Sequence, residues 1–187
     1  MLETKRPPKP QKPPITPLKP GQYVSPGISA RQEMLIGRLV VEWAKLEAMM
    51  QDAIWDILNV RFEDGRVLTA RMDARTKLQW LRTFSNRHVS QDELTKFSEI
   101  IELIELKQDD RNFIVHGTWS TMRPENVPVV SSLRQKSPPD EVLTESFPEW
   151  RMSEIIVDIK KCRDALVSWI ARREASLGKP PRPPLSG

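Results

Sequence analysis

The spacing of apolar residues along the chain predicts a long first helix over residues 29–60. Apolar side chains recur there every three or four positions, which places them on one face of a helix. Ser29 stands where its hydroxyl can cap the helix. The stripe consists of Leu35, Leu39, Trp43, Leu46, Met50, Ile54 and Ile57. A helix of this length is expected to pack lengthwise against another long helix.

The same rhythm predicts two more helices after a polar connection, "RFEDGRVLTARM". One covers residues 73–87, with Asp73 as its cap. The other begins at Ser90, which with Glu93 has the sequence of a capping box. Its apolar face runs toward Gly117, where we expect a left-handed C-terminal cap to close the helix.

The helical rhythm stops between residues 118 and 150, where five prolines interrupt it. We expect "TWSTM" and "VPVVSSL" to pair there as a small β-hairpin. A fourth helix begins near Arg151, with Ser153 as a candidate cap, and ends before Gly178. The expected fold is therefore all-α: a four-helix up-and-down bundle with a short extended insertion before the last helix.

Both ends of the chain differ from the middle in composition. Residues 1–28 hold eight of the 17 prolines, and residues 173–187 hold four more. Proline fixes φ and lacks an amide donor, so such stretches favour solvated, extended chain. We expect disordered basic tails at residues 1–28 and 173–187, and one helical domain over residues 29–172.

The charge follows the same division. The net charge of +4 splits into +4 for residues 1–28, +2 for residues 173–187 and −2 for the middle, which has 21 basic and 23 acidic side chains. A basic chain often has a polyanionic partner. Here the excess lies in the tails, which can equally be solubilising linkers. Any nucleic-acid contact of the domain must therefore be local or assisted by the tails.

Few residues are suited to metal binding or disulfide chemistry. Cys162 is the single cysteine, so no intrachain disulfide can form, and we expect it to be a packing residue. The two histidines, His88 and His116, form no cluster with metal-ligand spacing, so we expect neither metal nor cofactor. The first residues lack the apolar core of a secretory signal, and no apolar run approaches the roughly 20 residues of a membrane span. We expect a cytoplasmic protein.

The stretch "DDRNFIVHGTW" carries the candidate chemistry, at the end of the third predicted helix. At about 100° per residue, Asp109, Asn112 and His116 fall on one polar strip of that helix. Arg111 lies about 140° from His116 by the same arithmetic, on the apolar side. A partly buried arginine needs an anionic or carbonyl partner. We expect Glu47, on the buried stripe of the first helix, to pair with Arg111.

Arg111, the polar Asn112, three apolar residues and then His116 resemble the signature of the HEPN superfamily. In that family an arginine, four to six residues and a histidine lie at the end of a helix in an α-helical bundle. The resemblance extends over residues 29–172. It implies a metal-independent endoribonuclease of the kind found in toxins and phage defence, with a composite site at a homodimer interface.

The chemistry of RNA cleavage is compatible with these residue types. Attack of the 2′-hydroxyl on the adjacent phosphate needs a base, an acid for the leaving 5′-oxygen and positive charge for the phosphorane. Histidine can take either proton-transfer role near neutral pH, and a guanidinium can bind the phosphate. A homodimer supplies two copies of His116, one for each role. Asn112 would orient the ring or contact substrate, Asp109 would support the site, and Trp119 is a candidate for stacking on a base.

Two other interpretations stay open. A histidine and a glycine at the end of a helix are common without any catalysis, because the histidine interacts with the helix dipole and the glycine ends the helix. The chain could then be a non-catalytic helical dimer that binds a partner protein or a nucleotide, with the proline-rich tails as docking segments. An antitoxin is a possible partner under the toxin interpretation. His88 is expected to be a surface residue.

Overall fold

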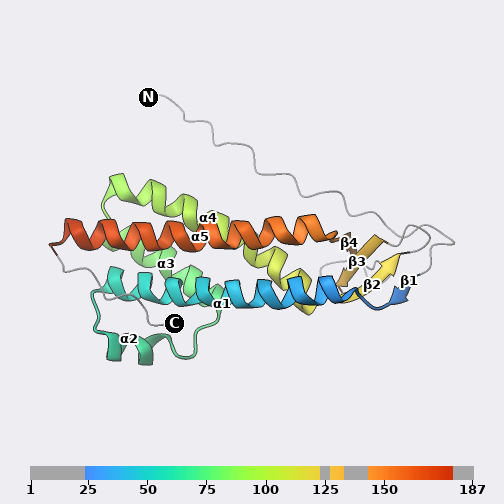
Figure 1. Cartoon of the computed structure of the whole chain (residues 1–187). Helices are drawn as coiled ribbons and strands as arrows, with labels where there is room; N and C mark the ends of the chain where they lie inside the picture. The colour runs from blue at the N-terminus through green and yellow to red at the C-terminus, as the bar shows by residue number, and fades with distance from the viewer. Residues whose placement is uncertain (1–23, 123–126, 133–142, 179–187) are drawn as a thin grey trace.

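A computed structural model describes residues 24–122, 127–132 and 143–178 (Figure 1). This part of the chain is mostly helical, with one small antiparallel sheet, so the expected helical class is confirmed. The tail predictions for residues 1–23 and 179–187 lie outside the described residues. In chain order the elements are β1 (Val24–Pro26), α1 (Ala30–Leu58), α2 (Phe62–Thr69), α3 (Ala74–His88), α4 (Gln91–His116), β2 (Thr118–Met122), β3 (Val127–Ser132), β4 (Leu143–Ser146) and α5 (Glu149–Ser176).

Helix α1 forms as its apolar spacing predicts. Ser29 caps it by accepting a hydrogen bond from the Gln32 amide, and the Gln32 side chain accepts from the Ser29 amide in return. The helix ends at Asn59, which adopts a left-handed conformation with φ of 51°. The whole predicted stripe is buried at 3% exposure or less. This stripe packs against α3, α4 and α5 and forms much of the core.

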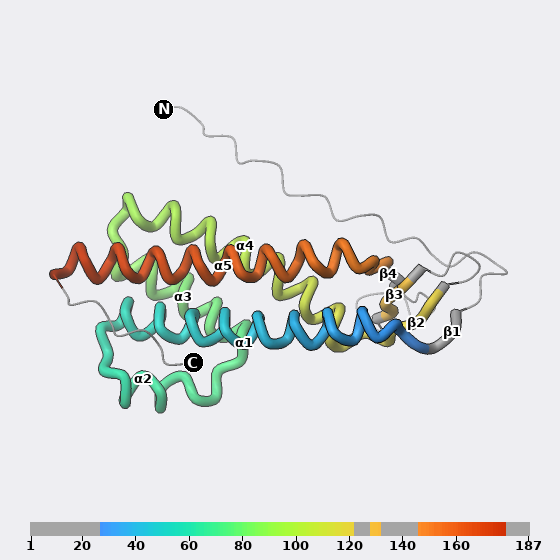
Figure 2. Tube along the Cα trace, viewed as in Figure 1, coloured from blue at the N-terminus to red at the C-terminus, as the bar shows by residue number. Residues whose placement is uncertain are grey.

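The helices do not alternate in direction as an up-and-down bundle would. Helices α1 and α5 both start beside the sheet and run away from it (Figure 2). Helix α3 runs the same way, because Lys77 near its start bonds to Glu47 in mid-α1 and His88 at its end lies beside the far end of α5. Helix α2 and its flanking connections return the chain between α1 and α3. The sequence pattern predicts only a polar connection in this segment and an alternating helix order, and both predictions were wrong: the segment contains α2, and the order does not alternate.

A cluster of charges joins the helix ends that lie far from the sheet. The Arg173 guanidinium is 3.0 Å from the Asp56 carboxylate in α1 and 3.8 Å from Glu93 in α4, and it donates to the His88 carbonyl at the end of α3. Arg173 is only 9% exposed. The expected domain boundary after residue 172 was therefore wrong, since α5 continues through this residue to Ser176.

The sheet contains the predicted hairpin and two strands that were not predicted. Strands β2 and β3 pair as expected, with Trp119 opposite Val130. Strand β1 pairs with β2 and strand β4 with β3, giving the order β1-β2-β3-β4. Strand β1 falls within residues 1–28, so the expected tail contributes three residues to the fold.

Three of the predicted helix ends differ in detail. The Ser90 hydroxyl makes no cap bond to the backbone of α4 and instead contacts the Glu93 carboxylate at 3.3 Å. Helix α5 begins at Glu149, and the Ser153 hydroxyl donates to the Glu149 carbonyl rather than capping the helix. Gly117 is extended, with φ of −81° and ψ of 159°, because the chain passes directly into β2. The Asp73 cap of α3 is confirmed: its carboxylate accepts from the Thr76 amide at 2.7 Å.

The core lies between the long helices and consists mostly of buried apolar side chains. Trp43 and Trp169 are each 2% exposed, so both are core residues. Cys162 is fully buried, and burial raises the pKa of its thiol to about 11, so the cysteine is a packing residue as predicted. No helix in the described part of the chain has the length and apolar character needed to cross a membrane.

Candidate functional site

The candidate site lies where α4 leaves the helical layer and enters the sheet. Phe113 and Ile114 anchor this last part of α4: Ile114 is fully buried, and the Phe113 ring lies 5.6 Å from the Phe147 ring. Gly117 fits between them and β3. A Cβ at this position would lie 2.1 Å from Val130 Cγ1 and 2.6 Å from the Phe113 carbonyl oxygen. The close approach, and not a left-handed backbone, explains the glycine after His116.

Arg111 contacts both of the other motif residues. Arg111 Nη1 donates to Asn112 Oδ1 at 2.9 Å and lies 3.2 Å from His116 Nε2. The expectation that Arg111 points away from His116 was wrong. Its Cα does lie on the other side of the helix, but the long side chain curves back across a turn and brings the guanidinium to the imidazole. His116 is exposed, so one edge of the cluster faces solvent.

The aromatic ring of Trp43 lies near the Arg111 guanidinium. Arg111 Cζ lies 6.0 Å from the Trp43 ring centroid, at the outer limit of a cation–π contact. Within the described part of the chain, Arg111 Nε is buried and has no hydrogen-bond acceptor. An unsatisfied charged donor costs stability. Arg111 thus contacts Asn112 and His116 while its Nε is left without an acceptor.

Glu47 does not pair with Arg111, contrary to expectation. One carboxylate oxygen of Glu47 accepts from the indole N–H of Trp43, and the other accepts from Lys77 Nζ of α3 at 3.1 Å. The Lys77 side chain is 5% exposed, so its ammonium needs this partner. Glu47 thus acts on Arg111 only through Trp43: it holds the indole near which the guanidinium lies.

Sequence reasoning missed Trp43 and Lys77 as parts of the site. Trp43 was assigned only to the core, although its four-residue spacing from Glu47 places the two side chains on one helix face. That spacing was the available signal. Lys77 gave none, because its identity as the partner of Glu47 depends on how α3 packs on α1.

The two remaining predicted residues occupy different environments. Asp109 is exposed on α4, two residues before Arg111. Trp119 is partly buried: its indole N–H donates to the Ile114 carbonyl at 2.8 Å, and its ring lies 6.3 Å from the Phe147 ring. Trp119 therefore packs the sheet onto the end of α4. Its stacking on a base stays a prediction.

An ion-pair chain fixes α4 to α5 just before the motif. Lys107 Nζ lies 3.0 Å from Asp158 and 3.6 Å from Asp110, and Lys161 lies 3.2 Å from Asp158. Burial alone would raise the pKa of Asp158, but the two lysines outweigh it and lower the pKa below its ordinary value. The ionised carboxylate therefore helps to hold the C-terminal half of α4 in place.

In the described ranges no group of three His, Cys, Asp or Glu side chains is arranged to hold a metal ion. The second histidine, His88, is exposed at the end of α3, as predicted. The chemistry available at the candidate site is thus that of an imidazole, a guanidinium and an amide at an open helix end. Comparisons with protein-family models, with curated proteins and with solved structures found no match to the chain.

Proposed function

We propose that the chain is a metal-independent endoribonuclease of HEPN type, active as a homodimer with a composite site. Arg111, Asn112 and His116 are its catalytic residues. Its helices form the helical bundle of that family in a non-alternating order. A cytoplasmic role as a toxin or in phage defence, with an antitoxin as a possible partner, belongs to the same proposal.

One observation carries the proposal. At the end of one helix, the Arg111 guanidinium contacts the amide oxygen of Asn112 at 2.9 Å and the exposed imidazole of His116 at 3.2 Å. A purely structural helix end needs no such cluster, because the dipole interaction of His116 does not require Arg111.

The proposed reaction is transesterification within RNA. One His116 accepts the proton of the 2′-hydroxyl as its oxygen attacks the phosphorus, and the bond to the 5′-oxygen breaks. The second His116 of the dimer gives a proton to that leaving oxygen. The guanidinium of Arg111 stabilises the charge of the phosphorane between these steps. The products are a 2′,3′-cyclic phosphate and a 5′-hydroxyl, and no electron transfer is involved.

Cleavage of end-labelled RNA in the presence of EDTA tests the proposal. The purified full chain should give products that end in cyclic phosphate, and His116→Ala should leave the RNA intact. His88→Ala is the matched control, because His88 is also exposed at the last position of a helix. Intact RNA with the wild-type chain, or equal cleavage by His116→Ala, would reject the nuclease.

A non-catalytic helical dimer is the second candidate. It is favoured by the apolar side chains exposed on the helices, among them Val41 at 53% and Trp150 at 64%. It predicts intact RNA together with stable self-association.

A further inference from the structure

The N-terminal half of α1 has a second apolar stripe, on the side away from the core. The stripe carries no charge over 19 residues and is exposed throughout, with Met34 at 47% and Val41 at 53%. Its members are Ala30, Met34, Gly37, Val41, Ala44 and Ala48. They follow alternating steps of four and three residues, the heptad spacing by which one helix packs along another. A Cβ placed on Gly37 would meet nothing within 4 Å.

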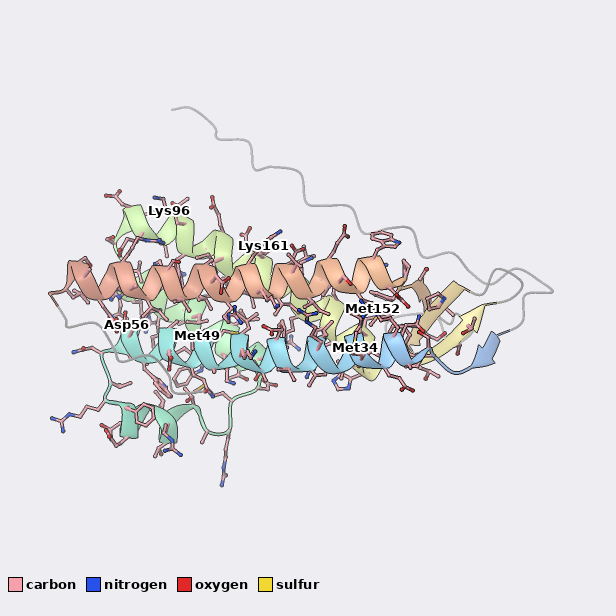
Figure 3. All side chains as sticks on the ribbon, in the orientation of Figure 1. Met34, Met49, Asp56, Lys96, Met152 and Lys161 are labelled. Carbon is pink, nitrogen blue, oxygen red and sulfur yellow. The ribbon has the colours of Figure 1, made fainter. Side chains whose placement is uncertain are left out.

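The stripe lies on an uncovered part of the described fold. In Figure 1 this half of α1 runs along the lower side of the molecule, with α5 above it, the end of α4 behind it and α2 only below its far end. Met34 is labelled on this half of the helix in Figure 3. By contrast, the exposed apolar residues of α5, such as Val157, alternate with Glu154 and Lys161. The uncharged seam is thus a feature of α1 among the long helices.

The charges beside the stripe identify its partner. On one flank, Arg31, Arg38 and Lys45 recur every seven residues and are all exposed. On the other flank lies Glu33, which is also exposed. Glu47, further along that side, is held by Trp43 and Lys77 and takes no part in the pairing. When two copies of such a helix pack in parallel, the basic flank of each faces the acidic flank of the other.

The spacing also fits individual residues. In a parallel, in-register pair, a residue on the acidic flank of one copy faces the residue five positions later on the basic flank of the other copy. Glu33 of one copy therefore meets Arg38 of the other, and two-fold symmetry gives this pair twice. An antiparallel pair would set Arg38 and Lys45 against the same basic flank of the partner.

We propose that the exposed stripe of α1 is a homodimer surface on which a second copy of the chain packs its own α1 in parallel and in register. The small residues let the two helices approach closely, and Met34 and Val41 are buried between them. The proposed function already includes a homodimer, and the inference goes beyond it by naming the surface and the orientation. It is argued from α1 alone and requires neither His116 nor RNA.

Sedimentation equilibrium of the full chain tests the surface. The wild type should be a dimer at micromolar concentrations, and Val41→Glu should be a monomer, because two carboxylates would face each other across the seam. Val157→Glu is the matched control on α5, where the valine is 48% exposed, and it should remain a dimer. Both valines are exposed, so both variants should keep the helical circular dichroism of the wild type. A monomeric wild type, or identical behaviour of the two variants, overturns the proposal.

A charge swap tests the orientation. Glu33→Arg should weaken the dimer by roughly tenfold, the size expected when two exposed ion pairs become repulsive. Adding Arg38→Glu should restore the wild-type dissociation constant. An antiparallel pair predicts no such rescue, and failure of the rescue overturns the parallel arrangement.

Cysteine cross-linking gives a second readout of the orientation. Ala44→Cys alone should form a disulfide-linked dimer in air, because position 44 faces itself in a parallel, in-register pair, whereas an antiparallel pair centred on the stripe sets it against position 34. Cys162 is fully buried and should not interfere. A mixture of Ala30→Cys and Ala48→Cys chains that cross-links while Ala44→Cys does not would overturn the proposal. Sedimentation tests the homodimer surface, and RNA cleavage tests the nuclease. Failure of one proposal can therefore be distinguished from failure of the other.

Discussion

At the scale of single residues, the Arg111 guanidinium connects Asn112 and His116 of α4 with the Trp43 ring of α1. The positions of Asn112 and His116 on one strip of α4 follow from helix geometry, and they could be read from the sequence. The contact of Arg111 with both residues could not be read from the sequence. An arginine side chain is longer than one helical turn, and its direction depends on the residues packed around it. The Trp43 ring that lies against its guanidinium comes from another helix.

The partner of Glu47 gives a prediction at this scale. A double-mutant cycle of Glu47→Gln and Lys77→Met should show a coupling of about 1–2 kcal/mol in the free energy of unfolding. Each single change leaves a partly buried charge or amide without its partner, whereas the double variant removes both. Urea denaturation measures the four stabilities. A larger coupling between Glu47 and Arg111 than between Glu47 and Lys77 would contradict the observed contacts.

At the scale of elements, apolar spacing located the long helices but missed α2. Helix α2 buries no apolar stripe: Phe62 and Val67 are 55% and 80% exposed. Instead, Gly65 packs against the Trp55 ring, and the Trp55 indole donates to Thr69. Such a helix is held by a few specific contacts, which leave no periodic signal. Strands β1 and β4 are equally short, and only their pairing with the predicted hairpin defines them.

Two glycines predict opposite effects of the same substitution. Gly117→Ala should destabilise the protein by about 1–3 kcal/mol, because its Cβ would collide with Val130 and with the Phe113 carbonyl. In the monomeric Val41→Glu background, Gly37→Ala should stabilise the protein by about 1 kcal/mol, since Gly37 lies in mid-helix and its Cβ would meet nothing within 4 Å of the same chain. Thermal unfolding of both variants checks the pair. Equal effects of the two would indicate that Gly117 is not closely packed against β3.

The contact between α4 and α5 should depend on pH through Asp158. Its pKa is lowered in the folded chain, so the ionised carboxylate stabilises the fold above its unfolded pKa, near 4, and this contribution is lost as the pH falls through the folded value. Asp158→Asn should therefore cost about 1 kcal/mol near neutral pH, and the difference from wild type should shrink below pH 4. Urea denaturation across the pH range measures it. A difference that stayed constant into acid would remove Asp158 from this role.

At the scale of the whole molecule, the helix directions explain where the site lies. Helices α1, α3 and α5 run away from the sheet, and α4 alone returns to it. The end of α4 must therefore reach the sheet, and His116 lies at that junction. The sequence could predict the number of long helices and the motif at the end of one. It could not predict the order, because the return path through α2 depends on tertiary packing.

The central claim is that the Arg111–Asn112–His116 cluster cleaves RNA, and the single-turnover cleavage rate of His116→Ala tests it most directly. Measured in EDTA with dimeric protein, this rate should fall at least about 100-fold below the wild-type rate, the usual contribution of a proton-transfer residue. The rate of His88→Ala should equal that of the wild type. A His116→Ala variant that folds, dimerises and cleaves RNA as fast as the wild type would contradict the account.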